Sequence, residues 1–375
     1  MEFMGVRVCI LETSIVMMVH AVMCIVAGAR IGLKSEEHET MSNKDALRFP
    51  IMASCTLFGL YLLVKKMRQD LLKVLLKSYF VVVGMFCVGQ AVRPIFELLL
   101  LPRDEEKRRD HVLLKRKNLF NFIEMDLIDV MAIALVGLPL LLVWAFTGSW
   151  LTNNIIGICL AVSMIGMMNL GSYKTAAMLL CGLFLYDIFW VFGTDVMVSV
   201  VRGFDAPIKI VWPRSGFLAP LLSQTHRSMN LSMLGLGDIA IPGFFIALML
   251  HFDRALERIA KKDDKINVPQ SCFYYRTSLL AYVLALISTF VAMHWSGHAQ
   301  PALLYIVPWL LIVSISVAFF RGHLSLLWNF TEEEPEEEKP EMSLWEKILD
   351  FLGLWKPKAS KDTKVDEEQD TKKTQ

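Results

Sequence analysis

The sequence of 375 residues is short of charge. Only 20% of its residues are Asp, Glu, Lys or Arg, against about 25% in an average soluble domain. In contrast, 55% are hydrophobic and the mean hydropathy is +0.47. The net charge of +1 provides no basic surface of the kind that binds nucleic acid, so we expect no nucleic-acid partner. This composition excludes an ordinary soluble domain.

Paired cysteine spacings are also missing. The seven cysteines lie almost entirely within apolar runs, and no two of them form a CxxC pair. This pattern predicts neither a disulfide framework nor a zinc site. We expect the cysteines to serve in packing, and the protein to bind no metal and no other cofactor.

The hydrophobic residues are concentrated in runs of about 20, the length at which a helix crosses the ~30 Å hydrocarbon core of a bilayer. This predicts an all-α, multi-pass membrane protein surrounded by lipid. We expect nine transmembrane helices, at about residues 8–29, 50–65, 76–99, 127–147, 151–170, 175–200, 233–252, 273–295 and 301–320. The first contains Glu12 and His20, and we expect it to remain uncleaved. Pro301 is expected in the first turn of the ninth.

Lys and Arg in the short loops predict the orientation. Residues 103–117 carry seven basic side chains and residues 254–265 carry five. With nine helices, these loops and the C-terminus share one side, which we expect to be the cytosol, and the N-terminus is lumenal or extracellular. The turn that holds Lys65, Lys66, Arg68 and Lys73 argues against this orientation, because it falls on the outer side.

We expect three regions along the chain. Residues 1–174 hold the first five helices as a scaffold, residues 175–320 hold helices six to nine, and residues 321–375 form a cytosolic tail. The tail begins with an acidic spacer. It continues with residues 343–355, which place Leu and Trp on one helical face that suits either a membrane interface or a partner protein.

The chain ends in "KKTQ". Lys372 and Lys373 match the dilysine pattern by which coat proteins return membrane proteins to the endoplasmic reticulum. This pattern works only in the cytosol, in agreement with the loop charges. We therefore expect a protein of the endoplasmic reticulum membrane, with coat proteins among its partners.

Acids inside the predicted helices are the candidates for chemistry, because an Asp at the centre of a transmembrane helix costs about 2.5–3.5 kcal/mol. The acids nearer the helix ends are Glu12, Asp126, Asp129 and Asp195. Asp187 and Asp238 lie deeper, on consecutive antiparallel helices. If their carboxyl groups meet, they cannot both ionise and must share one proton. The ionised group can then activate water while the protonated group polarises a carbonyl.

The residues around Asp238 fit this chemistry. Gly235 and Gly237 place no side chains ahead of the acid, so an extended peptide backbone can approach it, and each weakens a helix by about 1 kcal/mol relative to alanine. Pro242 interrupts the hydrogen bonds that follow. Because unwound backbone at membrane depth must line protein or a wet cavity, we expect a cavity at residues 235–242.

Other readings of the same residues remain open. A lone Asp can be a structural hydrogen-bonding group, and Gly with Pro can mark helix packing or a kink. Acids at the bilayer midplane and broken helices also fit a proton-coupled transporter, although no inverted repeat is visible. The acidic tail and its amphipathic segment favour a third reading, in which the protein is not an enzyme but retains or escorts membrane proteins for quality control.

Three motifs occur in order: "YD" in helix six, "GLGD" in helix seven and "QPALLY" at the start of helix nine. Together they resemble the intramembrane aspartyl proteases of the presenilin and signal peptide peptidase group. Longer stretches, such as "FLYDIFWVFGTDVMVSV" and "MLGLGDIAIPGFFIALML", are more similar to the signal peptide peptidase branch. The resemblance covers about residues 45–320 and implies a presenilin-like fold.

The resemblance also implies roles for individual residues. Asp187 and Asp238 would be the catalytic dyad, and Tyr186 would shape its pocket. Gly235, Leu236 and Gly237 would form the active-site loop, and Pro301, Ala302 and Leu303 would help to position substrate.

The resemblance further implies an endopeptidase that cleaves transmembrane helices. With the orientation predicted above, its substrates would be type II membrane proteins and the signal peptides that remain after signal peptidase cleavage. Further expected partners are a second copy of the chain and the machinery that degrades membrane proteins.

Overall fold

A computed structural model describes most of the chain. It covers residues 2–33, 39–41, 43–100, 117–120, 123–193, 207–213, 231–261, 272–296 and 300–332. Residues 1–332 form one compact unit, and the second unit, from Glu333 onward, lies outside the described residues. In the described part, nine helices are long and apolar enough to cross a membrane. This confirms the predicted all-α, multi-pass class.

The first five spans and the short strands among them occupy the N-terminal half. The first elements are α1 (Glu2–Gly32), β1 (Glu39–Thr40), α2 (Asn43–Lys66), α3 (Gln69–Leu100), β2 (Lys117–Phe120) and β3 (Ile123–Met125). The fourth span consists of α5 (Leu127–Ala132), the π-helical turn η2 (Ile133–Gly137) and α6 (Leu138–Thr147). It is followed by α7 (Trp150–Met167) and β4 (Met168–Asn169).

The remaining four spans follow. The elements are α8 (Tyr173–Phe192), β5 (Lys209–Pro213), β6 (Leu231–Gly235), α11 (Gly237–Ala260), α12 (Phe273–Ser296), α13 (Leu303–Phe320) and the short α14 (Leu324–Trp328). β5 and β6 pair in antiparallel fashion, whereas β1 pairs with β4 in parallel.

Two helices that carry candidate residues begin later than predicted. The seventh span begins at Gly237, because the residues before it form strand β6. The ninth begins at Leu303, so Pro301 lies ahead of the helix and not in its first turn. Both differences place the motif residues directly before a helix or in its first turn, where N–H groups have no partner within the helix.

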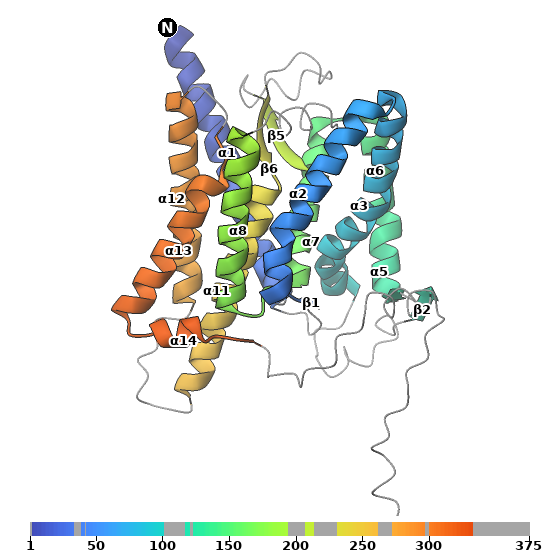
Figure 1. Cartoon of the computed structure of the whole chain (residues 1–375). Coiled ribbons are helices and arrows are strands. Elements are labelled where there is room, and N and C mark those ends of the chain that lie inside the picture. The colour runs from blue at the N-terminus through green and yellow to red at the C-terminus, as the bar shows by residue number, and fades with distance from the viewer. Residues whose placement is uncertain are drawn as a thin grey trace, which may run out of the picture. The chain divides into compact units, whose positions relative to one another are not determined.

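The helices run side by side, with β5 and β6 near the end of the bundle where α1 begins and α14 near the opposite end (Figure 1). α11 is the most enclosed of the nine candidate spans, with 78% of its apolar stretch buried, whereas none of the corresponding stretch of α2 is buried. The helix that carries Asp238 is therefore surrounded by protein, and α2 offers its apolar surface to lipid.

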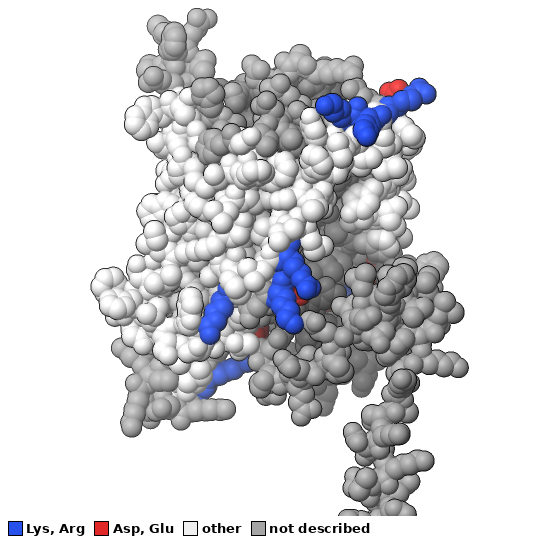
Figure 2. Space-filling model, viewed as in Figure 1, with Lys and Arg blue, Asp and Glu red and all other residues white. Residues whose placement is uncertain are grey.

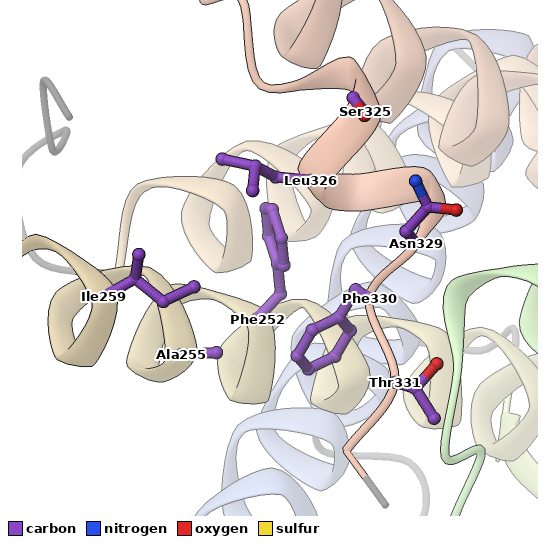
Figure 3. Close-up of a pocket in the computed structure, with 8 residues that line it drawn as sticks. All are labelled: Phe252, Ala255, Ile259, Ser325, Leu326, Asn329, Phe330 and Thr331. Atoms are coloured by element: carbon purple, nitrogen blue, oxygen red, sulfur yellow. The ribbon is translucent and has the colours of Figure 1, made fainter. Parts of the chain in front are cut away.

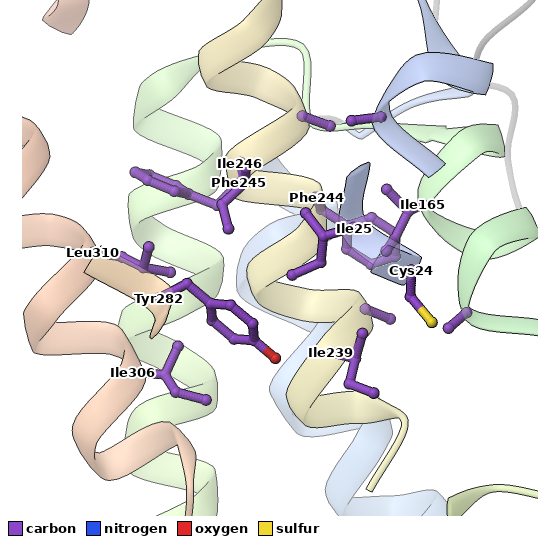
Figure 4. Packing of buried hydrophobic residues seen from close by; sticks show 14 of the residues in the cluster. Cys24, Ile25, Ile165, Ile239, Phe244, Phe245, Ile246, Tyr282, Ile306 and Leu310 are labelled. Atoms are coloured by element: carbon purple, nitrogen blue, oxygen red, sulfur yellow. The ribbon is translucent and has the colours of Figure 1, made fainter. Parts of the chain in front are cut away.

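Small residues let α1, α7 and α11 approach closely, which is a common device between membrane helices. A Cβ atom on Gly28 of α1 would lie 2.6 Å from Cβ of Ile165 on α7. A Cβ atom on Gly243 of α11 would lie 2.5 Å from Cδ1 of the same Ile165. Figure 4 shows Ile165 beside Ile25 and Phe244 in the apolar core that results.

Charged side chains avoid the middle of the face shown in Figure 2, where a broad white surface separates basic groups at the turn between α2 and α3 from others lower on the molecule. The helices of this face present apolar side chains outward, such as Met52 at 65% and Val74 at 63% exposure. An apolar surface of this extent is stable when it faces hydrocarbon and not water.

A cluster of charged side chains joins α3 to the start of the fourth span. Arg93 donates hydrogen bonds to Oδ2 of Asp126 at 2.7 Å, to Oδ1 of Asp129 at 2.8 Å and to Oε1 of Glu97 at 2.8 Å. The two aspartates begin the fourth span as predicted, but they are only 3% and 4% exposed. Their burial is tolerated because the guanidinium group binds both carboxylates in its planar fork.

Replacement of Arg93 should destabilise the bundle strongly. Arg93→Met leaves Asp126 and Asp129 buried beside each other without a cation, which we expect to cost about 3 kcal/mol of folding free energy. Glu97→Gln is the matched control, because that pair is partly exposed and worth about 0.5 kcal/mol. Thermal unfolding in detergent measures both variants. Equal unfolding temperatures for the two would show that the cluster does not hold α3 to the fourth span.

Candidate active site

Asp187 lies in the last turns of α8 and is 6% exposed. Its Oδ2 atom accepts a hydrogen bond of 3.2 Å from the backbone N–H of Leu303, the first residue of α13. The first N–H groups of a helix lack partners within the helix, and the positive end of the helix dipole attracts a carboxylate. The segment Pro301, Ala302 and Leu303, which is buried throughout, is thereby brought against Asp187.

Asp238 is the second residue of α11 and is half-buried, and Gly237 before it is exposed. A Cβ atom on Gly235 would lie 3.2 Å from Oδ2 of Asp238, so any side chain there would crowd the carboxyl group. Leu236 is buried, and its N–H donates to the carbonyl of Ile208 at 3.0 Å. The GLGD segment is therefore a strand end that turns directly into a helix, with open space beside its acid.

The two acids belong to helices that contact each other. In the described ranges, no group of three or more His, Cys, Asp or Glu side chains is arranged to hold a metal ion. The arrangement places two carboxyl groups, those of Asp187 and Asp238, on neighbouring helices.

Tyr186 is half-buried, and its ring centroid lies 6.3 Å from that of Trp190 on the same helix. Trp190 in turn donates its indole N–H to Oγ of Ser54 on α2 at 3.1 Å. These contacts place Tyr186 in an aromatic cluster between α8 and α2. Its predicted role in shaping the pocket of the acids stays a prediction.

The hairpin formed by β5 and β6 lies directly before Asp238 and is anchored on α7 by two consecutive asparagines. Asn154, which is 4% exposed, donates to the carbonyl of Val211 at 2.7 Å and accepts from the N–H of Val211 at 2.9 Å. Asn153 donates to the carbonyl of Lys209 at 2.9 Å. Through these bonds the carboxamides act as a substitute for a neighbouring strand along the outer edge of β5.

The same bonds indicate where the backbone of β6 points. Val211 lies opposite Met233 and Lys209 opposite Gly235. In an antiparallel pair, residues alternate between those that bond across the pair and those that point away. Because Val211 points away from β6 toward Asn154, Met233 and Gly235 must point away from β5. The backbone groups of Gly235 are thus directed outward beside the Asp238 carboxyl group.

An apolar pocket lies elsewhere in the bundle, between α11 and the segment that contains α14 (Figure 3). It has a volume of about 320 Å³ and is lined by Phe252, Ala255, Ile259, Ser325, Leu326, Asn329, Phe330 and Thr331. Phe252 is 14 residues beyond Asp238, or about 21 Å along the helix. No acid or base lines this pocket, so it is not the site of the carboxyl chemistry. The predicted cavity at residues 235–242 stays a prediction.

These features define a class of protein. The chain is a multi-pass helical membrane protein in which two neighbouring membrane-spanning helices each carry one acid, and an extended segment of backbone leads directly into one of these helices. Comparisons with known proteins narrow the class to a family.

The model of the signal peptide peptidase family matches residues 33–334. The signal peptide peptidase of Mus musculus is 37% identical over 322 residues, which cover 84% of this chain and 79% of the mouse protein. That of Homo sapiens is 36% identical over 310 residues, or 81% of this chain and 77% of the human protein. An intramembrane protease of Caenorhabditis elegans is 42% identical over 211 residues, which cover 56% of this chain and 44% of the worm protein.

The chain belongs to the signal peptide peptidase family. It is an intramembrane aspartyl protease, a hydrolase that acts on transmembrane peptides within the bilayer. The resemblance that the three sequence motifs carried is confirmed.

Sequence reasoning missed the residues that support the site. Asn153 and Asn154 were not singled out, although two adjacent amides in an apolar span were a visible signal. Their partners in β5 lie 56 and 57 residues away along the chain, and no local pattern could have identified them. The tie between Leu303 and Asp187 spans 116 residues. The resemblance implied that Pro301, Ala302 and Leu303 approach the two acids and help to position substrate, but it did not indicate which atoms bond.

Removal of the Asn154 amide should loosen the hairpin and slow the enzyme. Asn154→Leu keeps the volume but deprives the buried N–H and carbonyl of Val211 of their partners, each a loss of about 1–3 kcal/mol. We expect roughly tenfold lower turnover of a transmembrane peptide and a lower unfolding temperature. Thr152→Val is the control, since the Thr152 hydroxyl bonds only the Ser149 carbonyl of its own helix start, at 2.9 Å. Wild-type turnover by Asn154→Leu would refute the role of this anchor.

Proposed function

We propose that Asp187 and Asp238 are the catalytic dyad that hydrolyses peptide bonds inside the membrane. The observation that carries the proposal is that the two acids lie on helices that contact each other, with Asp187 bound at the start of α13 and Asp238 at the start of α11. The Leu303 N–H supports it by holding one carboxyl group, and Gly235 supports it by leaving space beside the other. Two such groups share one proton between them.

The reaction then uses both protonation states. The ionised carboxyl group removes a proton from water, and the water oxygen attacks the scissile carbonyl carbon. The protonated carboxyl group gives its proton to the carbonyl oxygen, which forms a diol. The carboxyl group that took the proton from water then gives it to the amide nitrogen, while the other carboxylate takes a proton from a diol hydroxyl group. The C–N bond breaks, and the products are a carboxylic acid and an amine. The dyad ends with one proton, as it began.

The substrate must reach the dyad in an extended form, because the carbonyls of a helix are used in its own hydrogen bonds. We propose that an unwound substrate segment lies along the outer edge of β6, where the backbone groups of Met233 and Gly235 point away from β5. Backbone pairing of this kind binds extended peptides without regard to most of their side chains. Helix-weakening residues in the substrate should therefore favour cleavage.

We propose that the substrates are transmembrane helices with a cytosolic N-terminus, namely type II membrane proteins and the signal peptides left by signal peptidase. The mouse and human relatives are called signal peptide peptidases, which supports this class. The basic residues Arg254, Arg258 and Lys261 at the end of α11 support a cytosolic position for that end of the bundle, with a lumenal N-terminus and a cytosolic C-terminus.

We propose that the protein resides in the endoplasmic reticulum membrane. The proposed binding of coat proteins depends on Lys372 and Lys373, which lie outside the described residues. A second copy of the chain and the membrane-protein degradation machinery remain proposed partners. The division of the chain into a scaffold of residues 1–174, a catalytic part of residues 175–320 and a tail of residues 321–375 is also a proposal. Family membership favours proteolysis over the escort and transporter readings.

Substitution of either acid should abolish proteolysis. Asp187→Asn and Asp238→Asn each remove one ionisable group, so neither variant can hold the shared proton, and we expect at least a thousandfold loss of turnover. Asp253→Asn is the matched control. It is also a buried acid of α11, but its carboxyl group accepts the N–H groups of Tyr274 and Tyr275, at 3.1 and 2.8 Å, at the start of α12.

Cleavage of a model signal peptide by purified protein in detergent measures all three variants. Retained turnover in Asp253→Asn with none in the other two is the expected result. Appreciable turnover by Asp187→Asn or Asp238→Asn would overturn the proposed dyad.

A further inference from the structure

The backbone carbonyl of Asp238 lacks its usual helical partner. Asp238 is the second residue of α11, and in a regular helix its carbonyl would accept the N–H of the residue four positions on. That residue is Pro242, which is buried in the same helix and has no N–H. A partly buried carbonyl that loses its helical donor is unfavourable unless another group donates to it. A donor from a neighbouring helix can replace the bond that Pro242 removes.

Tyr282 of α12 supplies that bond. Its hydroxyl group donates to the carbonyl oxygen of Asp238 at 3.0 Å. The side chain is fully buried, with 0% exposure. Figure 4 shows its ring between Ile306 of α13 and Ile239 of α11, with the hydroxyl group directed toward the start of α11. Burial in the apolar core restricts the positions from which the hydroxyl group can donate.

This bond acts on the acid through the backbone. The carbonyl and the carboxyl-bearing side chain are attached to the same Cα atom, so a displacement of the backbone at Asp238 also moves the carboxyl group. Without the hydroxyl group, the peptide plane would turn toward any other donor that it could reach. Displacement of a reacting group by about 1 Å can reduce a rate by about a hundredfold. The Tyr282 bond therefore controls the geometry of the dyad without touching substrate.

We propose that Tyr282 is a positioning residue of the protease, whose hydroxyl group replaces the helical bond that Pro242 removes and thereby orients Asp238. The inference rests on the proposed role of Asp238 in catalysis and extends it to a third helix, α12. It assigns a joint function to two residues that lie 40 positions apart in the sequence. The proline creates the need for a donor, and the tyrosine meets it.

The first test is Tyr282→Phe, which removes only the hydroxyl group. We expect kcat for a model signal peptide to fall at least tenfold with KM within twofold, because the substrate-binding backbone is unchanged. Tyr274→Phe is the matched control, since Tyr274 is a buried tyrosine of the same helix whose hydroxyl group bonds Nδ1 of His323 at 3.0 Å.

The control removes a bond of the same kind as the test does. Burial and the neighbouring Arg321 lower the pKa of His323, so its bond to Tyr274, like that of Tyr282, joins two neutral groups at pH 7. We expect Tyr274→Phe to lower the unfolding temperature about as much as Tyr282→Phe, with kcat within twofold of the wild type. Equal kcat values for the two variants would overturn the proposal.

The second test restores the missing helical bond. Pro242→Ala provides an N–H group to the Asp238 carbonyl, so the Tyr282 hydroxyl group should become dispensable in that background. We expect Tyr282→Phe to lower kcat at least tenfold when residue 242 is proline and less than threefold when it is alanine, a coupling that a double-mutant cycle measures. A tyrosine that served only to fill the core would show the same loss in both backgrounds.

The remaining outcomes also test the proposed role of Tyr282. If Tyr282→Phe alone does not fold, the proposal requires the double variant with Pro242→Ala to recover folding and activity. A double variant as defective as the single one contradicts the proposal. Asp238→Asn separates this inference from the proposed dyad. Turnover by Asp238→Asn defeats the dyad, whereas an inactive Asp238→Asn with a normal Tyr282→Phe defeats the role of Tyr282 alone.

Discussion

The placement of two acids on neighbouring membrane-spanning helices, Asp187 on α8 and Asp238 on α11, is the constraint around which this bundle is arranged. A single acid inside a transmembrane segment is costly, and two at close range cannot both ionise. Their burial therefore requires nearby donors, a controlled supply of water and helices that do not separate. An intramembrane protease needs the same three conditions, because it must bring water and a polar peptide bond together in a lipid environment.

Each neighbouring element contributes to this arrangement in a definable way. α13 offers the free N–H group at its start to Asp187, and α12 offers a hydroxyl group to the backbone of Asp238. α7 holds the hairpin through Asn154, so that Gly235 passes beside the acid. α11 is enclosed because it contacts α1, α7, α8, α12 and α13.

The sequence was sufficient to predict the nine membrane-spanning helices of the described residues, because an apolar run of bilayer length has few structural alternatives. It was insufficient at the start of α11, where the apolar residues Leu231–Gly235 form a strand and hydropathy alone does not separate strand from helix. The two acids could be selected by depth and by motif. The bonds of Arg93 to Asp126 and Asp129 and those of Asn154 to Val211 could not be predicted, because these partners lie 33 to 57 residues away and depend on how the helices pack.

The most direct test of the account is an experimental structure of the full chain with a bound peptide mimic that carries a hydroxyl group in place of the scissile carbonyl. The account predicts that this hydroxyl group lies about 2.5–3.2 Å from a carboxyl oxygen of both Asp187 and Asp238. It also predicts that the mimic is extended alongside β6. Carboxyl groups too far apart for one hydroxyl group to reach both, or a mimic bound elsewhere, would contradict the account.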